Sequence, residues 1–396
     1  MLDTKLEKQE NFFQNLNQKK NGKGLIQKRT TTRRKRVNQK IIDQKYHFIS
    51  MFNPKSGAYV RTGIINEYGQ DTGVDPFMAS FPHLIDVGIM GHCIHGKTGL
   101  CLKAGVGCYQ SGLTVEEPNM PLEDFLEIAR QCKGRVNQFA LGGRGDPDQH
   151  ENFAEILAAC AENNIVPNFT TSGYGLTREM AELAKRYCGA VAVSWYRNDY
   201  TLRAIQLLLD AGVKTNIHYV LGQNSIDEAI ARLETDDFPK GINGLVLLLH
   251  KPVGLGASSN VLSPKDERVA KLFKLIDRGK HKFKVGMDSC CVPGIVNFCE
   301  NVIPEAIDPC EGGRFSCYLS PDMVLLPCSF DQAHRYGVSL REHTIEQAWN
   351  SPAFEEFRVS LRSRCSECGK RENCMGGCPL LPEIVLCNDK PIYSTN

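Results

Sequence analysis

Short apolar runs alternate regularly with amphipathic segments between residues 84 and 290, and this alternation constrains the fold more than any other feature. Residues 84–89 and 136–141 are apolar runs of the length of a buried strand. Between them, at residues 122–132, apolar side chains recur three and four apart, as on one face of a helix. The same pair repeats until six strand-and-helix units can be recognised.

We expect strands over residues 84–89, 136–141, 166–170, 190–195, 215–220 and 245–249, with a further strand over 283–287. Helix ends are indicated by Thr177 as an N-cap, Gly212 as a left-handed C-cap, Ser225 with Glu228 as a capping box, and Pro264 as a helix start. Because each connection has room only for a crossover helix, the strands should be parallel. Right-handed crossovers then close into a barrel or spread into a doubly wound sheet, and both forms gather ligands at the carboxyl ends of the strands.

The chain has 17 cysteines among 396 residues, an odd number that cannot all pair within the chain. No apolar stretch approaches the roughly 18 residues that span a membrane, and the N-terminus lacks the apolar core of a secretory signal. We therefore expect a cytoplasmic protein without a membrane partner, in which clustered cysteines bind metal or do redox chemistry. The content of 42% hydrophobic and 23% charged residues excludes a chain too polar to bury a full core.

Three cysteines, Cys93, Cys101 and Cys108, follow directly on the first expected strand in a glycine-rich loop. Three thiolates at the carboxyl end of a strand can hold three corners of a metal centre and leave the fourth open for a ligand. A zinc site that adds His92 or His95 to these cysteines is the alternative.

The turn after the second expected strand reads GGRGDP and offers backbone groups to a ligand bound at the carboxyl ends of the strands. Asp146 in this turn could accept a hydrogen bond from an ammonium group. Ser194 ends the fourth strand and Asn216 lies in the fifth, and each is either a ligand contact or a satisfied polar group of the core. The candidate ligand-binding residues here are Gly142, Gly143, Arg144, Gly145, Asp146, Ser194 and Asn216.

Together with Tyr109, which adjoins the last cysteine, these motifs resemble the radical S-adenosylmethionine superfamily over residues 80–290. The resemblance implies an α/β fold, a partial (β/α)6 TIM-like barrel of parallel strands. It also implies a [4Fe–4S] cluster on the three cysteines and S-adenosylmethionine held by Tyr109, the GGRGDP turn and the region of Ser194 and Asn216. The chain departs from the family in the wider intervals between its cysteines and in carrying Asp146 at the acidic place of the turn.

A second group of cysteines lies between residues 300 and 396. Cysteines in the stretch 365–378 are separated by two, five and three residues, one more follows after a gap, and three precede the stretch. This spacing resembles the SPASM extension of radical enzymes that modify peptides and proteins, except that Met323 replaces the family's glycine. The resemblance implies two auxiliary [4Fe–4S] clusters, one on Cys310, Cys317, Cys328 and Cys378 and the other on Cys365, Cys368, Cys374 and Cys387. A cysteine-rich module with two zinc sites is the alternative.

Six cysteines remain outside these groups. Cys132, Cys160 and Cys188 lie on expected helices and are interpreted as buried small hydrophobic residues. Cys290, Cys291 and Cys299 lie near the end of the barrel, and the sequence assigns them no role beyond that of a candidate substrate-facing thiol.

Residues 1–45 carry 13 Lys and Arg against 4 Asp and Glu, a local net charge of +9. The segment is rich in Gln, Asn and Lys and lacks apolar periodicity, so we expect a disordered, solvated tail. An electrostatic arm for an acidic partner is the second interpretation. The expected domains are therefore this tail, a radical S-adenosylmethionine core over 80–290 and a small cysteine-rich iron–sulfur extension over 300–396.

The resemblance implies reductive cleavage of S-adenosylmethionine to a 5′-deoxyadenosyl radical that abstracts hydrogen from a peptide or protein substrate, with a flavodoxin or ferredoxin as external electron donor. Ser329 stands where sulfatase-maturing relatives carry an acidic residue, which argues against that role. Radical chemistry on a small molecule is one alternative. A non-enzymatic zinc-binding scaffold that binds nucleic acid is another, although no nucleic-acid motif accompanies the basic arm.

Overall fold

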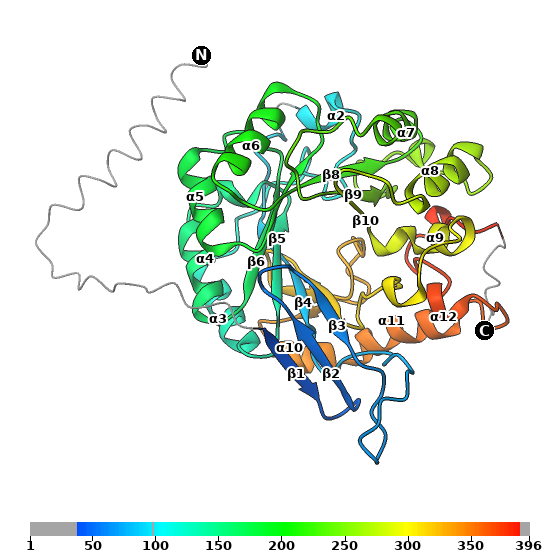
Figure 1. Cartoon of the computed structure of the whole chain (residues 1–396). Helices are drawn as coiled ribbons and strands as arrows, with labels where there is room; N and C mark the ends of the chain where they lie inside the picture. The colour runs from blue at the N-terminus through cyan, green and yellow to red at the C-terminus, as the bar shows by residue number, and fades with distance from the viewer. Residues whose placement is uncertain (1–37, 97–98, 389–396) are drawn as a thin grey trace, which may run out of the picture. The chain divides into compact units, whose positions relative to one another are not determined.

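The computed structural model describes residues 38–96 and 99–388. A three-stranded antiparallel sheet precedes a ten-stranded sheet whose outer face is covered by helices (Figure 1). The strands are β1 (Gln39–Asp43), β2 (Phe48–Phe52), β3 (Tyr59–Arg61), β4 (Leu84–Met90), β5 (Gln138–Gly143), β6 (Val166–Thr171), β7 (Val191–Ser194), β8 (Thr215–Leu221), β9 (Gly244–Leu249), β10 (Lys284–Met287), β11 (Ser316–Leu319), β12 (Val324–Leu326) and β13 (Val338–Ser339). The helices are α2 (Leu100–Lys103), α3 (Leu122–Cys132), α4 (Phe153–Glu162), α5 (Arg178–Tyr187), α6 (Asp199–Asp210), α7 (Ile226–Thr235), α8 (Glu267–Asp277), α9 (Val292–Phe298), α10 (Ile345–Trp349), α11 (Pro352–Ser363) and α12 (Arg371–Cys374).

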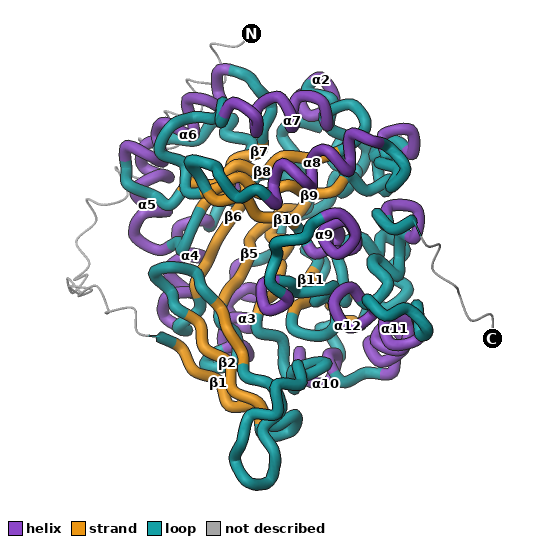
Figure 2. Tube along the Cα trace, turned by 45° about the vertical axis from the view of Figure 1, so that its right-hand side comes forward, coloured by secondary structure: helices purple, strands orange, loops and turns teal. Residues whose placement is uncertain are grey.

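Strands β4 to β10 follow one another across the large sheet in chain order, and each pairs in parallel with the next. The crossover helices lie outside the strands, as Figure 2 shows. This arrangement confirms the predicted partial barrel, with β10 as the further strand that was expected near its end.

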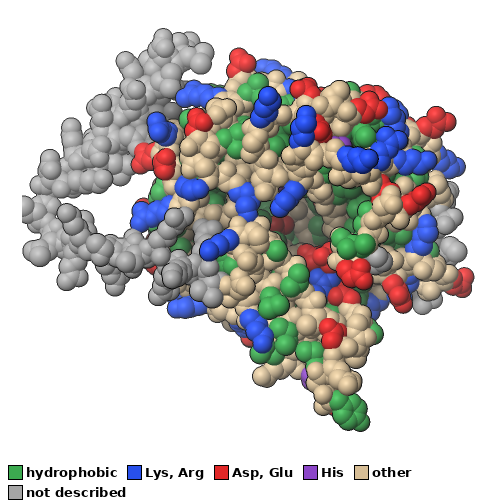
Figure 3. Space-filling model, in the orientation of Figure 1, with side chains coloured by type: hydrophobic (Ala, Val, Ile, Leu, Met, Phe, Trp, Pro, Cys, Tyr) green, Lys and Arg blue, Asp and Glu red, His purple; other side chains and the backbone are tan. Residues whose placement is uncertain are grey.

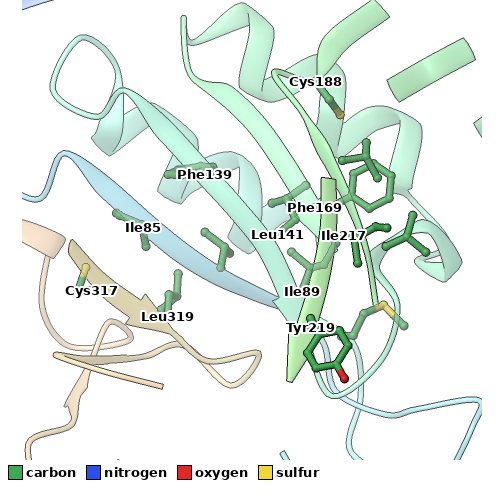
Figure 4. Packing of buried hydrophobic residues seen from close by; sticks show 14 of the residues in the cluster. Ile85, Ile89, Phe139, Leu141, Phe169, Cys188, Ile217, Tyr219, Cys317 and Leu319 are labelled. Carbon is green, nitrogen blue, oxygen red and sulfur yellow. The ribbon is translucent and has the colours of Figure 1, made fainter. Parts of the chain in front are cut away.

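Alternation along each strand separates a helix-facing side from a barrel-facing side. In β8, Ile217, Tyr219 and Leu221 are buried in the core, whereas the intervening Asn216, His218 and Val220 are half-buried. The helix-facing side chains of neighbouring strands form one continuous core (Figure 4). Cys132, Cys160 and Cys188 belong to this core, as predicted.

The C-terminal extension continues the sheet of the barrel. Strand β11 pairs in parallel with β4, with Cys317 opposite Ile85, and β12 and β13 follow as antiparallel neighbours. Trp349 of α10 joins the barrel core and donates from Nε1 to the carbonyl oxygen of Ala79 at 3.0 Å.

Three local expectations were wrong. Strand β1 begins inside the segment 1–45, so the predicted tail is too long; residues 1–37 lie outside the described residues. Ser225 bonds to the backbone of Val220 and Gly222 rather than forming a capping box with Glu228. Helix α8 begins at Glu267 rather than Pro264.

The side chain of Asp266 caps α8 by accepting from the backbone N–H of Arg268. The sheet β1–β3 was not predicted, because its strands are short and half-exposed. Within residues 38–96 and 99–388, none of the helices has the length and apolar character to cross a membrane. Figure 3 shows basic and acidic side chains interspersed over the visible face, so the basic excess of residues 1–45 does not continue there as a patch of one sign.

Candidate iron–sulfur and cofactor site

The three-cysteine loop lies at the carboxyl ends of the barrel strands. Cys93 follows β4, Cys101 lies within α2, and Cys108 lies in the loop before α3. A Cβ atom added to Gly112 would lie 3.0 Å from the Cβ of Cys93 and 3.6 Å from the Sγ of Cys108. The backbone N–H of Gly112 also donates to the Sγ of Cys108 at 3.4 Å. Glycine at position 112 therefore lets Cys93 and Cys108 approach each other.

Burial dominates the electrostatics of two of these thiols, Cys93 and Cys101. It raises the pKa of Cys93 to about 12, with smaller contributions from Asp146, Cys101 and Cys108, and it also raises the pKa of Cys101. Such thiols stay protonated unless a positive group compensates the thiolates, which is what a metal cluster provides. The donor set of three grouped, half-buried thiols therefore fits an iron–sulfur cluster.

The two histidines of the loop have other partners. The ring of His92 bonds to the carbonyl of Glu117 at 3.3 Å, and buried His95 contacts Ser172 at 2.8 Å and Asp146 at 3.3 Å. Within the described ranges, no three His, Cys, Asp or Glu side chains converge on a position for a single metal ion. Contacts to either histidine therefore give no support to the zinc alternative.

The loop after β9 packs against the third cysteine. The backbone N–H of Leu255 donates to the carbonyl of Cys108 at 2.9 Å, and Gly254 adopts a left-handed φ of 60°. A Cβ atom on Gly254 would lie 2.4 Å from the carbonyl oxygen of Tyr109. The loops after β4 and β9 are therefore in backbone contact across the carboxyl ends of the strands.

The GGRGDP turn lies directly beside the three-cysteine loop. A Cβ atom on Gly143 would lie 2.4 Å from the carbonyl oxygen of Met90, and one on Gly145 would lie 2.4 Å from that of His92. Gly142 differs, because no heavy atom lies within 4 Å of its Cβ position. Two glycines thus bring the turn against the end of β4 and the loop that follows it, while Gly142 borders open space.

The charged side chains of this turn have partners within the chain. Arg144 pairs with Glu117 at 2.5 Å. The carboxylate of Asp146 accepts from the backbone N–H of Ser172 at 2.9 Å and from its hydroxyl, and it also contacts His95. Asp146 therefore joins the turns after β5 and β6, which differs from the expected role of binding an ammonium group.

Of the two polar residues predicted on later strands, only Ser194 lies at the mouth of the barrel, which is the end formed by the carboxyl ends of the strands. Ser194 ends β7, and burial followed by the nearby thiol of Cys101 raises the pKa of Tyr196, two positions further along the chain. Asn216 is the second residue of β8, at the amino end of the barrel, and its Oδ1 accepts from Nδ2 of Asn243 at 2.7 Å. The expectation that Asn216 binds cofactor at the carboxyl ends was therefore wrong.

Tyr109 and two further residues line the mouth between the barrel and the extension. The ring of Tyr109 lies 5.0 Å from that of Phe330, and the ammonium of Lys251 lies 4.8 Å from the Phe330 ring centroid. Lys251 is 7% exposed and forms an ion pair with Asp288. Burial opposes the charge of Lys251, but Asp288 outweighs it and raises the lysine pKa.

Sequence reasoning missed an acidic residue of the barrel interior, Asp86. It lies between Ile85 and Val87, whose side chains are fully buried on the opposite, helix-facing side of β4. The side chain of Asp86 itself is exposed on the barrel-facing side of the strand. One acidic residue within an otherwise apolar strand was the signal that could have identified it.

The cysteines of the extension form two groups in the structure. In the first group, burial raises the pKa of Cys374, and the nearby thiols of Cys365, Cys368 and Cys387 raise it further. These four cysteines, which the resemblance assigned to one cluster, therefore lie near one another. In the second, Cys310 and Cys328 approach each other across Gly312, whose Cβ position is 3.6 Å from the Cys310 Sγ and 3.7 Å from the Cys328 Cβ.

Cys317, which was predicted to join Cys310 and Cys328, lies elsewhere. It is 2% exposed on β11, and its nearest titratable neighbours are Cys132 of α3 and Asp86. Two of the cysteines near the end of the barrel have surroundings of their own. Cys291 is fully buried, and the Sγ of Cys299 donates to the carbonyl of Phe273 at 3.7 Å.

Known proteins resemble this chain in its barrel and in its C-terminal extension. The family model described as the SPASM iron–sulfur cluster-binding domain matches residues 310–375. The PqqA peptide cyclase of Granulibacter bethesdensis is 24% identical over 286 residues, which are 65% of this chain and 73% of that protein.

Two solved structures share the fold. SuiB of Streptococcus suis bound to S-adenosylmethionine superposes with a TM-score of 0.57 at 17% identity over 78% of each chain. SuiB bound to the precursor peptide SuiA gives a TM-score of 0.62 at 14% identity, covering 89% of this chain and 100% of that one.

The chain shares the fold of these solved structures, a partial barrel of parallel strands. Residues 310–375, which match the SPASM domain, follow this barrel as a C-terminal extension. The resemblance expected from the motifs is confirmed.

Proposed function

We propose that this protein cleaves S-adenosylmethionine reductively and uses the resulting radical to modify a ribosomally made peptide or a protein. The observation that carries the proposal is the position of three thiols of one loop at the carboxyl ends of the barrel strands, in a chain with a SPASM domain. Ligands of parallel barrels bind at this end.

Cys93, Cys101 and Cys108 would hold a [4Fe–4S] cluster with one open iron. When bound, the cluster and S-adenosylmethionine supply one electron and a 5′-deoxyadenosyl radical that abstracts hydrogen from an unactivated carbon.

The chain's own residues position the cofactor and exclude water. Gly142 leaves room for the cofactor beside the loop, and Gly143 and Gly145 hold the turn against Cys93. The rings of Tyr109 and Phe330 cover the side of the mouth that faces the extension. The carboxylate of Asp86, exposed on the barrel-facing side of β4, can take or return a proton there.

Two similarities support a peptide as the substrate. The relative from Granulibacter bethesdensis is named a PqqA peptide cyclase, and SuiB was solved with a precursor peptide. We propose carbon–carbon or thioether crosslinking within such a peptide, with electrons from a flavodoxin or ferredoxin. The remaining grouped cysteines near the extension would hold two auxiliary clusters, which together with the first cluster gives about 12 irons per chain.

The basic N-terminal segment would recruit an acidic leader region of the peptide, an idea motivated by its charge of +9 over residues 1–45. Because β1 begins at Gln39, the test is deletion of residues 1–37 only. Weaker binding of an acidic peptide, with salt dependence lost, is expected. Unchanged affinity would remove this part of the proposal.

The function is tested by anaerobic purification, measurement of iron and sulfide, and detection of 5′-deoxyadenosine after addition of dithionite and S-adenosylmethionine. We expect about 12 irons per chain and formation of 5′-deoxyadenosine. Zinc in place of iron, with no 5′-deoxyadenosine, would contradict the proposal and favour a zinc-binding scaffold.

A further inference from the structure

Cys317 and Cys290 occupy places that differ from those the sequence assigned to them. The spacing of the extension gave Cys317 to an auxiliary cluster and left Cys290 without a role. The structure places Cys290 in the short 3₁₀ helix Ser289–Cys291 that follows β10, at the carboxyl end of the barrel.

The strand geometry turns Cys317 away from the other cysteines of its expected group. Successive side chains of a strand point to opposite faces. Tyr318 points toward the three-cysteine loop, because Nε2 of Gln110 donates to its hydroxyl at 3.5 Å. Cys317 therefore points to the opposite, helix-facing side, where it lies near Cys132 and beside Leu319 in the core (Figure 4).

Cys290 instead contacts the group directly. Its thiol lies next to that of Cys378, and the thiols of Cys310 and Cys328 also lie close enough to interact electrostatically with it. Cys310 and Cys328 in turn lie on either side of Gly312, whose Cβ position is 3.6 Å from the Sγ of Cys310 and 3.7 Å from the Cβ of Cys328.

Contacts that do not involve the thiols also bring the segments of Cys290 and Cys378 together. A Cβ atom on Gly377 would lie 3.0 Å from Cγ of Pro293, and Gly377 adopts a left-handed φ of 75°. Nζ of Lys370 also bonds to Oδ1 of Asn297 at 3.1 Å. Helix α9 and the segment around α12 thus pack together, as Figure 1 also shows for the yellow and red parts of the chain.

Two further contacts connect the segment of Cys290 with the segment that carries Cys328. Asp288, two positions before Cys290, forms its ion pair with Lys251, and the Lys251 ammonium lies 4.8 Å from the Phe330 ring centroid. The carboxyl ends of β9 and β10 and the loop after Cys328 therefore meet at one place.

We propose that Cys290, Cys310, Cys328 and Cys378 together ligate one auxiliary iron–sulfur cluster, with Cys290 in the place that the spacing assigns to Cys317. The inference rests on the proposed function for the presence of iron–sulfur clusters, and it adds a ligand from the barrel itself, outside the matched range 310–375. This cluster is then attached to the mouth of the barrel, and the cluster on Cys365, Cys368, Cys374 and Cys387 is the outer one.

The test uses the full chain with Cys93, Cys101 and Cys108 replaced by Ala, which leaves only the auxiliary clusters. Cys290→Ala and Cys317→Ala are each added, with Cys132→Ala as the matched control for a buried non-ligand cysteine. Iron and sulfide are measured anaerobically, and the dithionite-reduced samples are examined by electron paramagnetic resonance.

We expect Cys290→Ala to lower iron from about 8 to between 4 and 7 per chain and to change one of the two cluster spectra. Cys290→Ser should retain more iron and shift the same spectrum, because a serine oxygen can replace the thiolate. Cys317→Ala should match Cys132→Ala in iron and spectrum.

An unchanged spectrum for Cys290→Ala, or a loss of iron in Cys317→Ala beyond that in Cys132→Ala, would overturn the ligand assignment. Absence of iron from the parent with all its cysteines would instead contradict the proposed function. The two failures are therefore distinguishable.

Discussion

The two cysteine groups next to the barrel mouth are built in different ways. Cys93, Cys101 and Cys108 come from one loop after one strand, whereas Cys290, Cys310, Cys328 and Cys378 come from four separate segments. Chain order identifies the members of the first group. The members of the second are identified only when strand direction and tertiary contacts are known, as the opposite orientations of Cys317 and Tyr318 show.

The packing that holds each group also differs. The three-cysteine loop depends on glycines that allow close approach of the chain. Gly112 lies in the loop itself, Gly145 in the GGRGDP turn and Gly254 in the loop after β9. The extension depends on buried side chains such as Arg358, which donates from Nε to the carbonyl of Gly313 at 2.6 Å and from Nη2 to that of Trp349 at 2.8 Å. Changes at the loop should therefore affect the cofactor first, and changes in the extension should affect folding first.

Replacing Cys93, Cys101 and Cys108 by Ala should have the largest effect. Formation of 5′-deoxyadenosine should fall at least about 1,000-fold, because no open iron remains to bind S-adenosylmethionine. About 4 of 12 irons should be lost while the auxiliary clusters stay. Loss of all iron would show that the two groups do not form independently and would break the comparison.

Arg358→Ala should destabilise the protein by about 3 kcal/mol, because it leaves the buried carbonyls of Gly313 and Trp349 without donors. Chemical denaturation of the anaerobic protein measures this change. Arg335→Ala, which removes an exposed ion pair on the same extension, is the control and should change stability by less than about 0.5 kcal/mol. Equal effects of the two variants would contradict the anchoring role of Arg358.

Gly145→Ala and Gly142→Ala distinguish two roles of glycine in the GGRGDP turn, close packing against the neighbouring loop and space for a bound ligand. Gly145→Ala should cost about 2 kcal/mol of stability, since its Cβ would lie 2.4 Å from the carbonyl oxygen of His92. Gly142→Ala should leave stability within about 0.5 kcal/mol yet weaken S-adenosylmethionine binding about 10-fold. Calorimetric titration measures the affinity. Unchanged affinity in Gly142→Ala would show that the open space beside it is not used.

His83 should make stability depend on pH. It is 4% exposed, its Nδ1 lies 2.7 Å from the hydroxyl of Tyr59, and burial lowers its pKa to about 4. The unfolded chain therefore binds the proton first as pH falls below about 6.5, and stability falls with it. When the pH is lowered from 7.5 to 5.5, the free energy of unfolding should fall by about 1.4 kcal/mol more in the unmodified protein than in His83→Gln. An identical pH dependence of the two proteins in denaturation experiments would contradict this effect.

The sequence predicted most of the barrel because periodicity records which side of each element is buried. Thr177 shows that local capping chemistry could also be predicted, since its side chain accepts from the backbone of Met180. Asn216 was linked to the cofactor by the family resemblance, although the expected strand over 215–220 already places it at the amino end of that strand. Cys317 was misassigned for a related reason: spacing counts residues, whereas ligation depends on the face of the strand to which a thiol points.

The central claim is that one loop at the barrel mouth holds the cluster that binds S-adenosylmethionine. Electron paramagnetic resonance of the dithionite-reduced, anaerobic protein, recorded with and without S-adenosylmethionine, tests it most directly. The account predicts that S-adenosylmethionine shifts the signal of one cluster, and that this signal is missing when Cys93, Cys101 and Cys108 are replaced by Ala. A spectrum that S-adenosylmethionine leaves unchanged, or a shift that persists in the triple variant, would contradict it.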